Sequence, residues 1–278
     1  TNYRYKIILT TYTNCDATSN IPQPEGPNLT IGIYGHDVQN DPLNGGVKTW
    51  ITDATITLVD SNQIDPNLPG NCPIGSNVCI YKGVYEGFVD LPLNFNGYHV
   101  FYERCCRNGS IVNLIPSESM AFHAFIPSPL LPNTSPIFTD DPVPFLCAGD
   151  TTTILNTAYD PDGDLLVFSF VTPYNGLANA NNPAPLPPQP NLGWNIPNVT
   201  YAGGYSMASP FGAGGYSYIN GSIGLTSYYP PTTGDYVVAV EIKEYRNGNL
   251  IGVTRRDLQL LVLNCTANGT PSLSPSLG

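Results

Sequence analysis

The sequence is poor in charged residues, which make up 11% of the chain against roughly 25% in an average soluble domain. Only 10 residues are Lys or Arg, and the formal net charge is −11. A nucleic-acid partner is therefore not expected, because binding phosphates requires clustered basic side chains. Gly, Pro and Tyr occupy the place that Lys and Glu usually take, and this composition favours short strands and turns over helices.

Histidine is also scarce, and His36, His99 and His123 fall in different segments. The chain has no Cys-x-x-Cys pair, so a structural zinc site is not expected. The scattered histidines argue against a catalytic triad, and we interpret them as structural and the protein as not an enzyme. A glycan hydrolase with paired carboxylates remains a minor alternative. No apolar run is long enough to span a membrane, so direct membrane insertion is not expected.

Seven cysteines in a chain with almost no helical pattern indicate an oxidising compartment, and hence an extracellular protein. They are Cys15, Cys72, Cys79, Cys105, Cys106, Cys147 and Cys265. The odd number implies that at least one thiol is free, bonds to another molecule, or has a partner outside this sequence.

The positions of the cysteines suggest some disulfides and argue against others. Cys147 opens the second half and Cys265 ends its last strand, so we expect these two to be bonded. Cys72 and Cys79 could close the loop between them. The adjacent pair Cys105-Cys106 is expected to bond to different partners, because a bond between neighbours requires an awkward ring. The alternative is that the cysteines are buried thiols.

Segments rich in β-branched and aromatic residues recur along the whole chain and predict an all-β fold. The clearest are Tyr3–Thr13, Thr49–Val59, Val78–Leu91, Tyr98–Arg104, Met120–Ile126, Leu165–Val171, Asp235–Tyr245 and Leu250–Leu263. The sequences Asn94–Gly97 and Arg246–Asn249 both read as hairpin turns between strands. The proline-rich stretch from Pro127 to Pro136 is the best linker. We therefore predict two tandem β-sandwiches, over residues 1–132 and 133–265, and a Ser/Pro-rich tail over residues 266–278.

The sharpest short motif is Asp160-Pro-Asp-Gly-Asp164, which has three carboxylates at alternate positions around a turn. Such oxygens can converge on a hard cation, and calcium is the usual choice. The motif lacks the spacing of an EF-hand loop, so further ligands must come from elsewhere, and Asp140 and Asp141 are candidates. The simpler interpretation is an Asp/Gly turn with solvated carboxylates.

Aromatic residues gather in the second half and raise the possibility of a glycan-binding surface. They include Trp194, Tyr201, Tyr205, Tyr216, Tyr218, Tyr228 and Tyr229, with Trp50 in the first half. We expect a mixture of buried rings and rings exposed for contact with a partner. Asp150-Thr-Thr152 resembles a short acceptor motif for O-glycosylation in Bacteroidetes, with Thr151 as the acceptor.

Several segments together resemble a family of large Bacteroidetes cell-surface proteins. The most specific runs from Gly97 to Asn113 and includes Glu103-Arg-Cys-Cys-Arg107, and Ala158–Asp164 and Gly234–Val240 also match. The segments Ser135–Phe138, Glu244–Gly248 and Arg255–Gln259 complete the series, in the expected order over nearly the whole chain.

The resemblance implies a secreted, adhesin-like module associated with gliding motility or type IX secretion. It also implies immunoglobulin-like or cadherin-like β-sandwich domains, with structural calcium at Asp160, Asp162 and Asp164. The expected role is structural or adhesive, as part of a surface filament or layer, with other surface proteins, copies of itself or glycans as partners. A carbohydrate-binding module is the main alternative. The basic residues Lys243, Arg246, Arg255 and Arg256 are expected to neutralise nearby acids.

Overall fold

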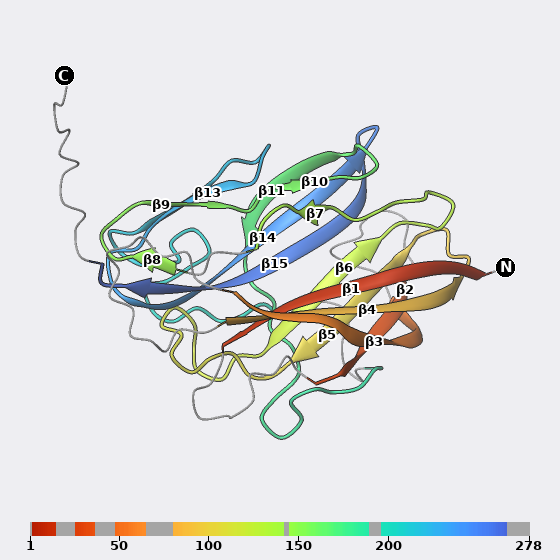
Figure 1. Ribbon diagram of the computed structural model, residues 1–278, viewed down its shortest axis with the longest axis horizontal. Coiled ribbons are helices and arrows are strands. Elements are labelled where there is room, and N and C mark those ends of the chain that lie inside the picture. Colours follow the sequence, from red (N-terminus) through yellow and green to blue (C-terminus); the bar gives the residue numbers. More distant parts are fainter. Residues whose placement is uncertain are drawn as a thin grey trace, which may run out of the picture.

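The computed structural model describes residues 2–14, 26–36, 48–64, 80–141, 145–188 and 196–265. Within these residues every regular element is a strand, so the all-β fold class is confirmed. Three sheets account for all of the strands, and Figure 1 shows the long strands of the two halves of the chain packed side by side.

The largest sheet runs through both halves of the chain without interruption. Its strands follow the order β1 (Asn2–Asn14), β4 (Ile80–Pro92), β3 (Lys48–Ile64), β2 (Asn28–His36), β5 (Tyr98–Arg104), β6 (Met120–Ile126), β15 (Asn249–Leu263), β14 (Gly234–Arg246) and β11 (Leu165–Val171). A short strand, β8 (Phe145–Cys147), pairs in parallel with the end of β15.

Two small sheets complete the second half of the molecule. One pairs β10 (Ala158–Tyr159) with β7 (Ile137–Phe138). The other has the order β12 (Tyr216–Ile219), β13 (Leu225–Tyr229) and β9 (Thr152–Leu155). The β7–β10 pair positions the start of the Asp160–Asp164 turn, which follows β10 directly.

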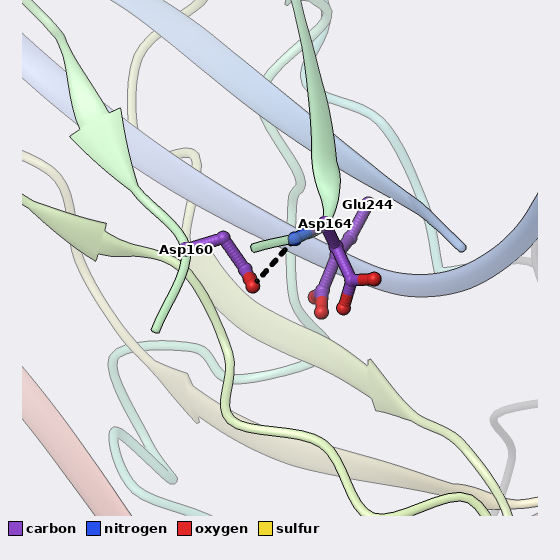
Figure 2. Close-up of side chains that lie close together, drawn as sticks. All are labelled: Asp160, Asp164 and Glu244. Carbon is purple, nitrogen blue, oxygen red and sulfur yellow. Dashed lines mark hydrogen bonds between the residues drawn. The ribbon is translucent and has the colours of Figure 1, made fainter. Parts of the chain in front are cut away.

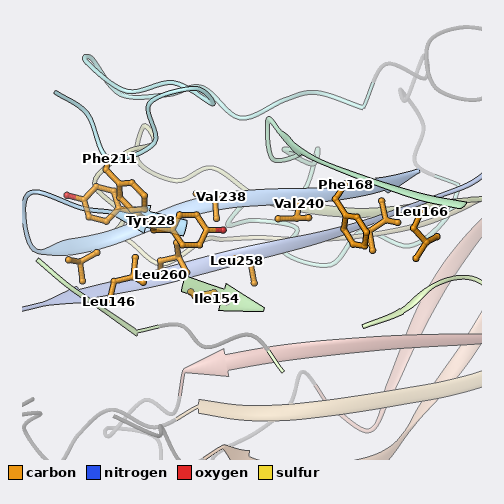
Figure 3. Close-up of a cluster of buried hydrophobic side chains, with 13 residues drawn as sticks. Leu146, Ile154, Leu166, Phe168, Phe211, Tyr228, Val238, Val240, Leu258 and Leu260 are labelled. Carbon is orange, nitrogen blue, oxygen red and sulfur yellow. The ribbon is translucent and has the colours of Figure 1, made fainter. Parts of the chain in front are cut away.

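Each half has its own hydrophobic core. The first-half core combines inward residues of β2, β3 and β4, such as Ile33, Ile56 and Leu91, which are fully buried. The second-half core packs β14 and β15 against β13, with Tyr228, Val240 and Leu260 at its centre (Figure 3). The alternating burial of β3 and β6 matches the period of two that their sequences predict.

The halves are joined by a narrow sheet contact and by buried polar anchors. The sheet continues across them where Val253 and Thr254 of β15 pair with β6. The segment after β5 then crosses to the second half. There Asn113, fully buried, exchanges hydrogen bonds of 2.9 Å with the backbone N–H and carbonyl of Val237. Arg107 makes a bidentate ion pair with Asp257 at 2.6 and 3.0 Å.

One predicted hairpin is wrong. The turn Asn94–Gly97 exists, and the Asn94 side chain accepts the backbone N–H of Asn96 at 2.8 Å, but β4 and β5 are not paired. Both edges of β4 are already occupied by β1 and β3, so the turn leads to a strand elsewhere in the sheet. Gly97, at φ +92°, is needed because a Cβ there would meet the carbonyl oxygen of Ile126.

The hairpin at the C-terminal end is confirmed. β14 and β15 pair over nearly their full length, and the turn residues Asn247 and Gly248 both have positive φ, at 53° and 81°. Asn-Gly favours this conformation, which matches the twist of paired strands. A bulge lies between Glu244 and Tyr245, close to the turn.

Candidate metal centre

The turn between β10 and β11 is organised by the first residue of the Asp160–Asp164 motif. Asp160 Oδ1 accepts the backbone N–H groups of Asp162 and Asp164 at 2.9 and 3.0 Å. Gly163 adopts φ +84°, a conformation that glycine reaches without steric cost. This compact turn places the carboxylates of Asp160 and Asp164 on the same side, facing the end of β14 (Figure 2).

The third carboxylate of the cluster comes from Glu244, a residue of β14 that the sequence analysis did not select. Ligand atoms of Asp160, Asp164 and Glu244 lie within 4.8 Å of one another, and these three residues are called the acidic cluster below. Glu244 lies opposite Gly252 of β15. A Cβ on Gly252 would collide with the Glu244 carboxylate, so the glycine provides the space that this side chain occupies.

The oxygens of the acidic cluster are poorly satisfied. Glu244 is 1% exposed, yet neither of its carboxylate oxygens makes a hydrogen bond. Asp160 Oδ2 is also buried and has no hydrogen-bond partner. Burial raises the pKa of Glu244 to about 8, the Asn133 side chain opposes this rise, and the charges of Asp160 and Asp164 add to it. Burying a carboxylate without partners costs free energy of folding, so this site is suited to a cation or a hydrogen-bond donor that the oxygens can bind.

Arg246 supplies positive charge at one side of the cluster. Its guanidinium bonds to both oxygens of Asp164, at 2.7 and 2.5 Å, and to the side-chain oxygen of Asn133 at 2.9 Å. The hydrogen bonds from Arg246 hold the pKa of Asp164 below its usual range. Asp164 is therefore compensated, and the unmet demand for positive charge lies at Glu244 and Asp160.

The structure separates the other predicted ligands from the cluster. Asp162 Oδ2 accepts the backbone N–H of Thr134 at 2.6 Å and lies 3.8 Å from the guanidinium of Arg246. Asp141 instead pairs with Lys82 of β4 at 2.6 Å and accepts a hydrogen bond from Tyr12. Asp140 accepts a hydrogen bond from Thr139 at 2.7 Å. Both therefore make their contacts at other sites, where cationic and hydroxyl partners are already available.

The predicted neutralising role of the basic residues is confirmed for Arg246 and Arg255. Arg255 donates to the buried carboxylate of Glu241 at 2.6 Å and lies over the ring of Tyr174, 3.6 Å from its centre. Lys243 lies 3.8 Å from the same carboxylate. Arg256 donates to the backbone carbonyl of Asp140 and stacks on Phe138.

The predicted disulfide between Cys147 and Cys265 is present, with the two Cα atoms 5.4 Å apart. The prediction for Cys105-Cys106 is wrong, because these neighbours are bonded to each other across a cis peptide bond. The cis peptide brings the two Cα atoms to 3.0 Å, which makes the bond between neighbours possible. Cys15, Cys72 and Cys79 lie outside the described residues, as does Trp194.

The three histidines, which the sequence places in separate segments, meet in the interior. His36 Nδ1 lies 3.0 Å from His99 Nε2, and His99 Nδ1 lies 2.8 Å from His123 Nε2. They project from β2, β5 and β6, which are neighbours in the sheet, and all are buried. Sequence order alone gave no signal for this chain of imidazoles, because it depends on which strands pair.

The tyrosines of the second half are divided between core and surface, as expected. Tyr228 is fully buried, whereas Tyr216 and Tyr218 on β12 are exposed. The rings of Tyr216 and Tyr229 stack in parallel, 5.7 Å apart. The predicted glycosylation residue Thr151 is exposed beside them, and its hydroxyl is 3.0 Å from that of Tyr216.

Comparisons with known proteins found no match to this chain among protein-family profiles, curated proteins or solved structures. Among the described residues, no helix has the length and apolar character required to cross a membrane.

Proposed function

We propose that this protein is an extracellular structural or adhesive module of a bacterial cell surface, stabilised by calcium bound at the acidic cluster. The observation that carries the proposal is the buried Glu244 carboxylate, whose oxygens have no hydrogen-bond partner beside two further carboxylates. The Cys147–Cys265 disulfide and the all-β fold are compatible with an exported protein.

The chemistry of the donors fits calcium. Asp160, Asp164 and Glu244 offer only oxygen ligands, which hard cations prefer, and calcium accepts carboxylates in irregular arrangements. Zinc would favour nitrogen and sulfur ligands, which the cluster lacks. When bound, calcium would supply the positive charge that Glu244 and Asp160 lack. The chain's own residues would then hold the β10–β11 turn against the end of the β14–β15 hairpin.

The proposal keeps the division into two modules of immunoglobulin-like or cadherin-like type, over residues 1–132 and 133–265. Its support is that the two hydrophobic cores draw on separate parts of the chain. The partners proposed are other surface proteins or copies of this chain. The resemblance to Bacteroidetes adhesin-like proteins supports the same role.

Calcium titration of the whole chain, followed by calorimetry and thermal unfolding, tests this function. We expect calcium to raise the Tm of the wild type and the chelator to lower it, since a ligand of the folded state stabilises by about 2.7 kcal/mol at 100 times its Kd. Glu244→Gln should lose this response. Asp162→Asn is the matched control, because Asp162 belongs to the motif but bonds to Thr134 instead, and it should respond like the wild type.

Two results would contradict the calcium site. The first is a wild type whose Tm and heat of mixing are unchanged by calcium. The second is a Glu244→Gln variant that responds as fully as the wild type. Electron microscopy with and without chelator would then show whether particles assemble at all and whether assembly needs the ion.

A carbohydrate-binding role is the second candidate, favoured by the exposed face of the β12–β13–β9 sheet. Tyr216 and Tyr218 are exposed there next to the hydroxyls of Thr153 and Ser227, and none of these side chains is charged. Such a face suits a neutral sugar. Glycan binding that is lost in Tyr218→Ala would favour this role over the first.

A further inference from the structure

Among the described residues, the first strand of the large sheet has a paired neighbour on one side alone. β1 pairs with β4 over 13 residues, and on the other side no described residue donates or accepts a backbone hydrogen bond. Unpaired strand edges are templates for another strand, and proteins usually protect them with charged side chains, prolines, bulges or covering loops. The two charged residues of β1, Arg4 and Lys6, are paired with Asp90 and Glu86 of β4. β1 has no proline and no glycine, and its pairing with β4 shows no register shift.

The opposite edge of the same sheet is treated differently. β11 has only 7 residues, and its Phe168 donates its backbone N–H to the carbonyl of Gly221 at 2.8 Å. A loop from elsewhere in the chain therefore covers part of that edge. Interior pairings such as β2–β3 and β3–β4 contain bulges, whereas β1–β4 has none. Within the part of the chain that the structure describes, the edge of β1 is thus uncovered, whereas that of β11 is partly covered.

The sequence of β1 is self-complementary about its central residue. Ile8 is the midpoint of the strand, and the apolar run Ile7-Ile8-Leu9 is flanked by polar residues on both sides. In an antiparallel pair of two such strands centred on Ile8, Lys6 of one copy lies opposite Thr10 of the other. Arg4 likewise lies opposite Tyr12, so no two cations face each other.

This register also preserves the two faces of the sheet. Residues that face each other in an antiparallel pair point to the same side. Exposed Ile8 would meet its own copy, and Ile7 would meet Leu9, which like Ile7 packs on the first-half core. A parallel, in-register pair would instead place Arg4 on Arg4 and Lys6 on Lys6, which is destabilising.

We propose that β1 is a homodimerisation edge, where a second copy of this chain adds its own β1 antiparallel about Ile8. The two large sheets would become one, with roughly a dozen inter-strand hydrogen bonds over about 40 Å of strand. The contact is isologous and closes on itself, so it produces dimers, and endless sheets do not follow from it. This rests on the proposed structural role, because association of copies is how such a module would act.

Sedimentation of the whole chain over a range of concentrations, in chelator and in calcium, tests the inference. We expect a concentration-dependent dimer in both conditions, because the acidic cluster lies at the other end of the sheet order from β1. Ile8→Lys should abolish it, since the twofold axis would set two lysines opposite each other. In the monomer the new lysine faces Glu86, so the fold is retained, which circular dichroism verifies.

Val59→Lys is the matched control, because Val59 is as exposed as Ile8 but belongs to β3, two strands from the edge. It should leave the dimer intact. Substitutions at Thr10 then test the register. Thr10→Glu should tighten the dimer about tenfold and Thr10→Lys should weaken it about tenfold, because both symmetric pairs with Lys6 change together.

The possible outcomes distinguish failure of the β1 dimer from failure of the calcium site. A wild type that stays monomeric at every concentration overturns the dimer while leaving the calcium site to its own titration. A dimer that survives Ile8→Lys, or that responds equally to both Thr10 substitutions, places the contact on another surface. A dimer that forms only in calcium would mean that association depends on the acidic cluster, which also contradicts an edge formed by β1 alone.

Discussion

Two glutamates on β14 lie three residues apart and are almost equally buried, yet their surroundings are opposite. Glu241, 3% exposed, accepts a hydrogen bond from Arg255 and has Lys243 nearby. Glu244, 1% exposed, has no hydrogen bond and faces two further carboxylates. They point to opposite faces of the strand, because their positions differ by three and side chains alternate between faces with a period of two. Burial alone therefore does not distinguish the two glutamates, whereas the presence or absence of a compensating charge does.

Removing Glu241, the compensated carboxylate, should have the largest destabilising effect. Glu241→Ala would leave Arg255 inside the protein without its ion-pair partner, and breaking a buried pair on one side costs about 3–5 kcal/mol. We expect a loss of this size in the free energy of unfolding, measured by urea denaturation. A loss below about 1 kcal/mol would mean that water compensates Arg255, and the contrast with Glu244 would then weaken.

The substitution Glu244→Gln, which removes the ionisable group at the uncompensated carboxylate, should stabilise the protein when a chelator has removed calcium. The pKa of Glu244 is raised to about 8 in the folded protein, so the folded state keeps a proton that the unfolded chain loses above about pH 4.3. This group therefore lowers the stability of the wild type as pH rises from about 4.3 to 8. Glu244→Gln removes that loss.

At pH 8 and without calcium, Glu244→Gln should be more stable than the wild type by up to about 5 kcal/mol, since the folded and unfolded pKa values differ by almost 4 and each pKa unit corresponds to about 1.4 kcal/mol. The two proteins should converge towards pH 4. Denaturation curves at several pH values measure the difference, with Asp53→Asn, on an exposed part of β3, as the control. A constant difference across this pH range would contradict a raised pKa at Glu244.

The smallest effect is expected at the more distant partner of Glu241. Lys243 lies 3.8 Å from that carboxylate and its side chain is 33% exposed, so solvent screens the pair. Lys243→Ala should change the free energy of unfolding by less than about 1 kcal/mol. A larger loss would show that Arg255 alone does not satisfy Glu241.

The strand positions could be read from the sequence because they depend on local patterns. Tyr98–Arg104, Met120–Ile126 and Leu165–Val171 are strands with the predicted bounds, and the Asn-Gly turn gives the C-terminal hairpin. The Cys147–Cys265 bond could also be predicted, because both cysteines adjoin strands that end a module. These features need only residues that are close in sequence or adjacent to recognisable strand ends.

Apart from the bond between Cys105 and Cys106, the features that the sequence did not reveal depend on strand pairing. Glu244 joins Asp160 only because β14 pairs with β11, and the histidine chain exists only because β2, β5 and β6 are neighbours. The predicted hairpin at Asn94–Gly97 fails for the same reason, since β1 and β3 already occupy β4. One signal for Glu244 was available: an acidic residue near the end of an apolar strand, opposite Gly252 on the returning strand.

The Cys147–Cys265 disulfide has a consequence for the response of this protein to pulling. The bond links two residues that are 118 positions apart, and they enclose nearly all of the second half. Tension applied along the chain from outside this loop passes through the sulfur atoms and bypasses the backbone between them. At about 3.4 Å per residue, a loop of 118 residues corresponds to roughly 400 Å of extended chain, and the disulfide prevents this length from being pulled out. Under load the second half therefore keeps its extension fixed, because its length is limited by a covalent bond.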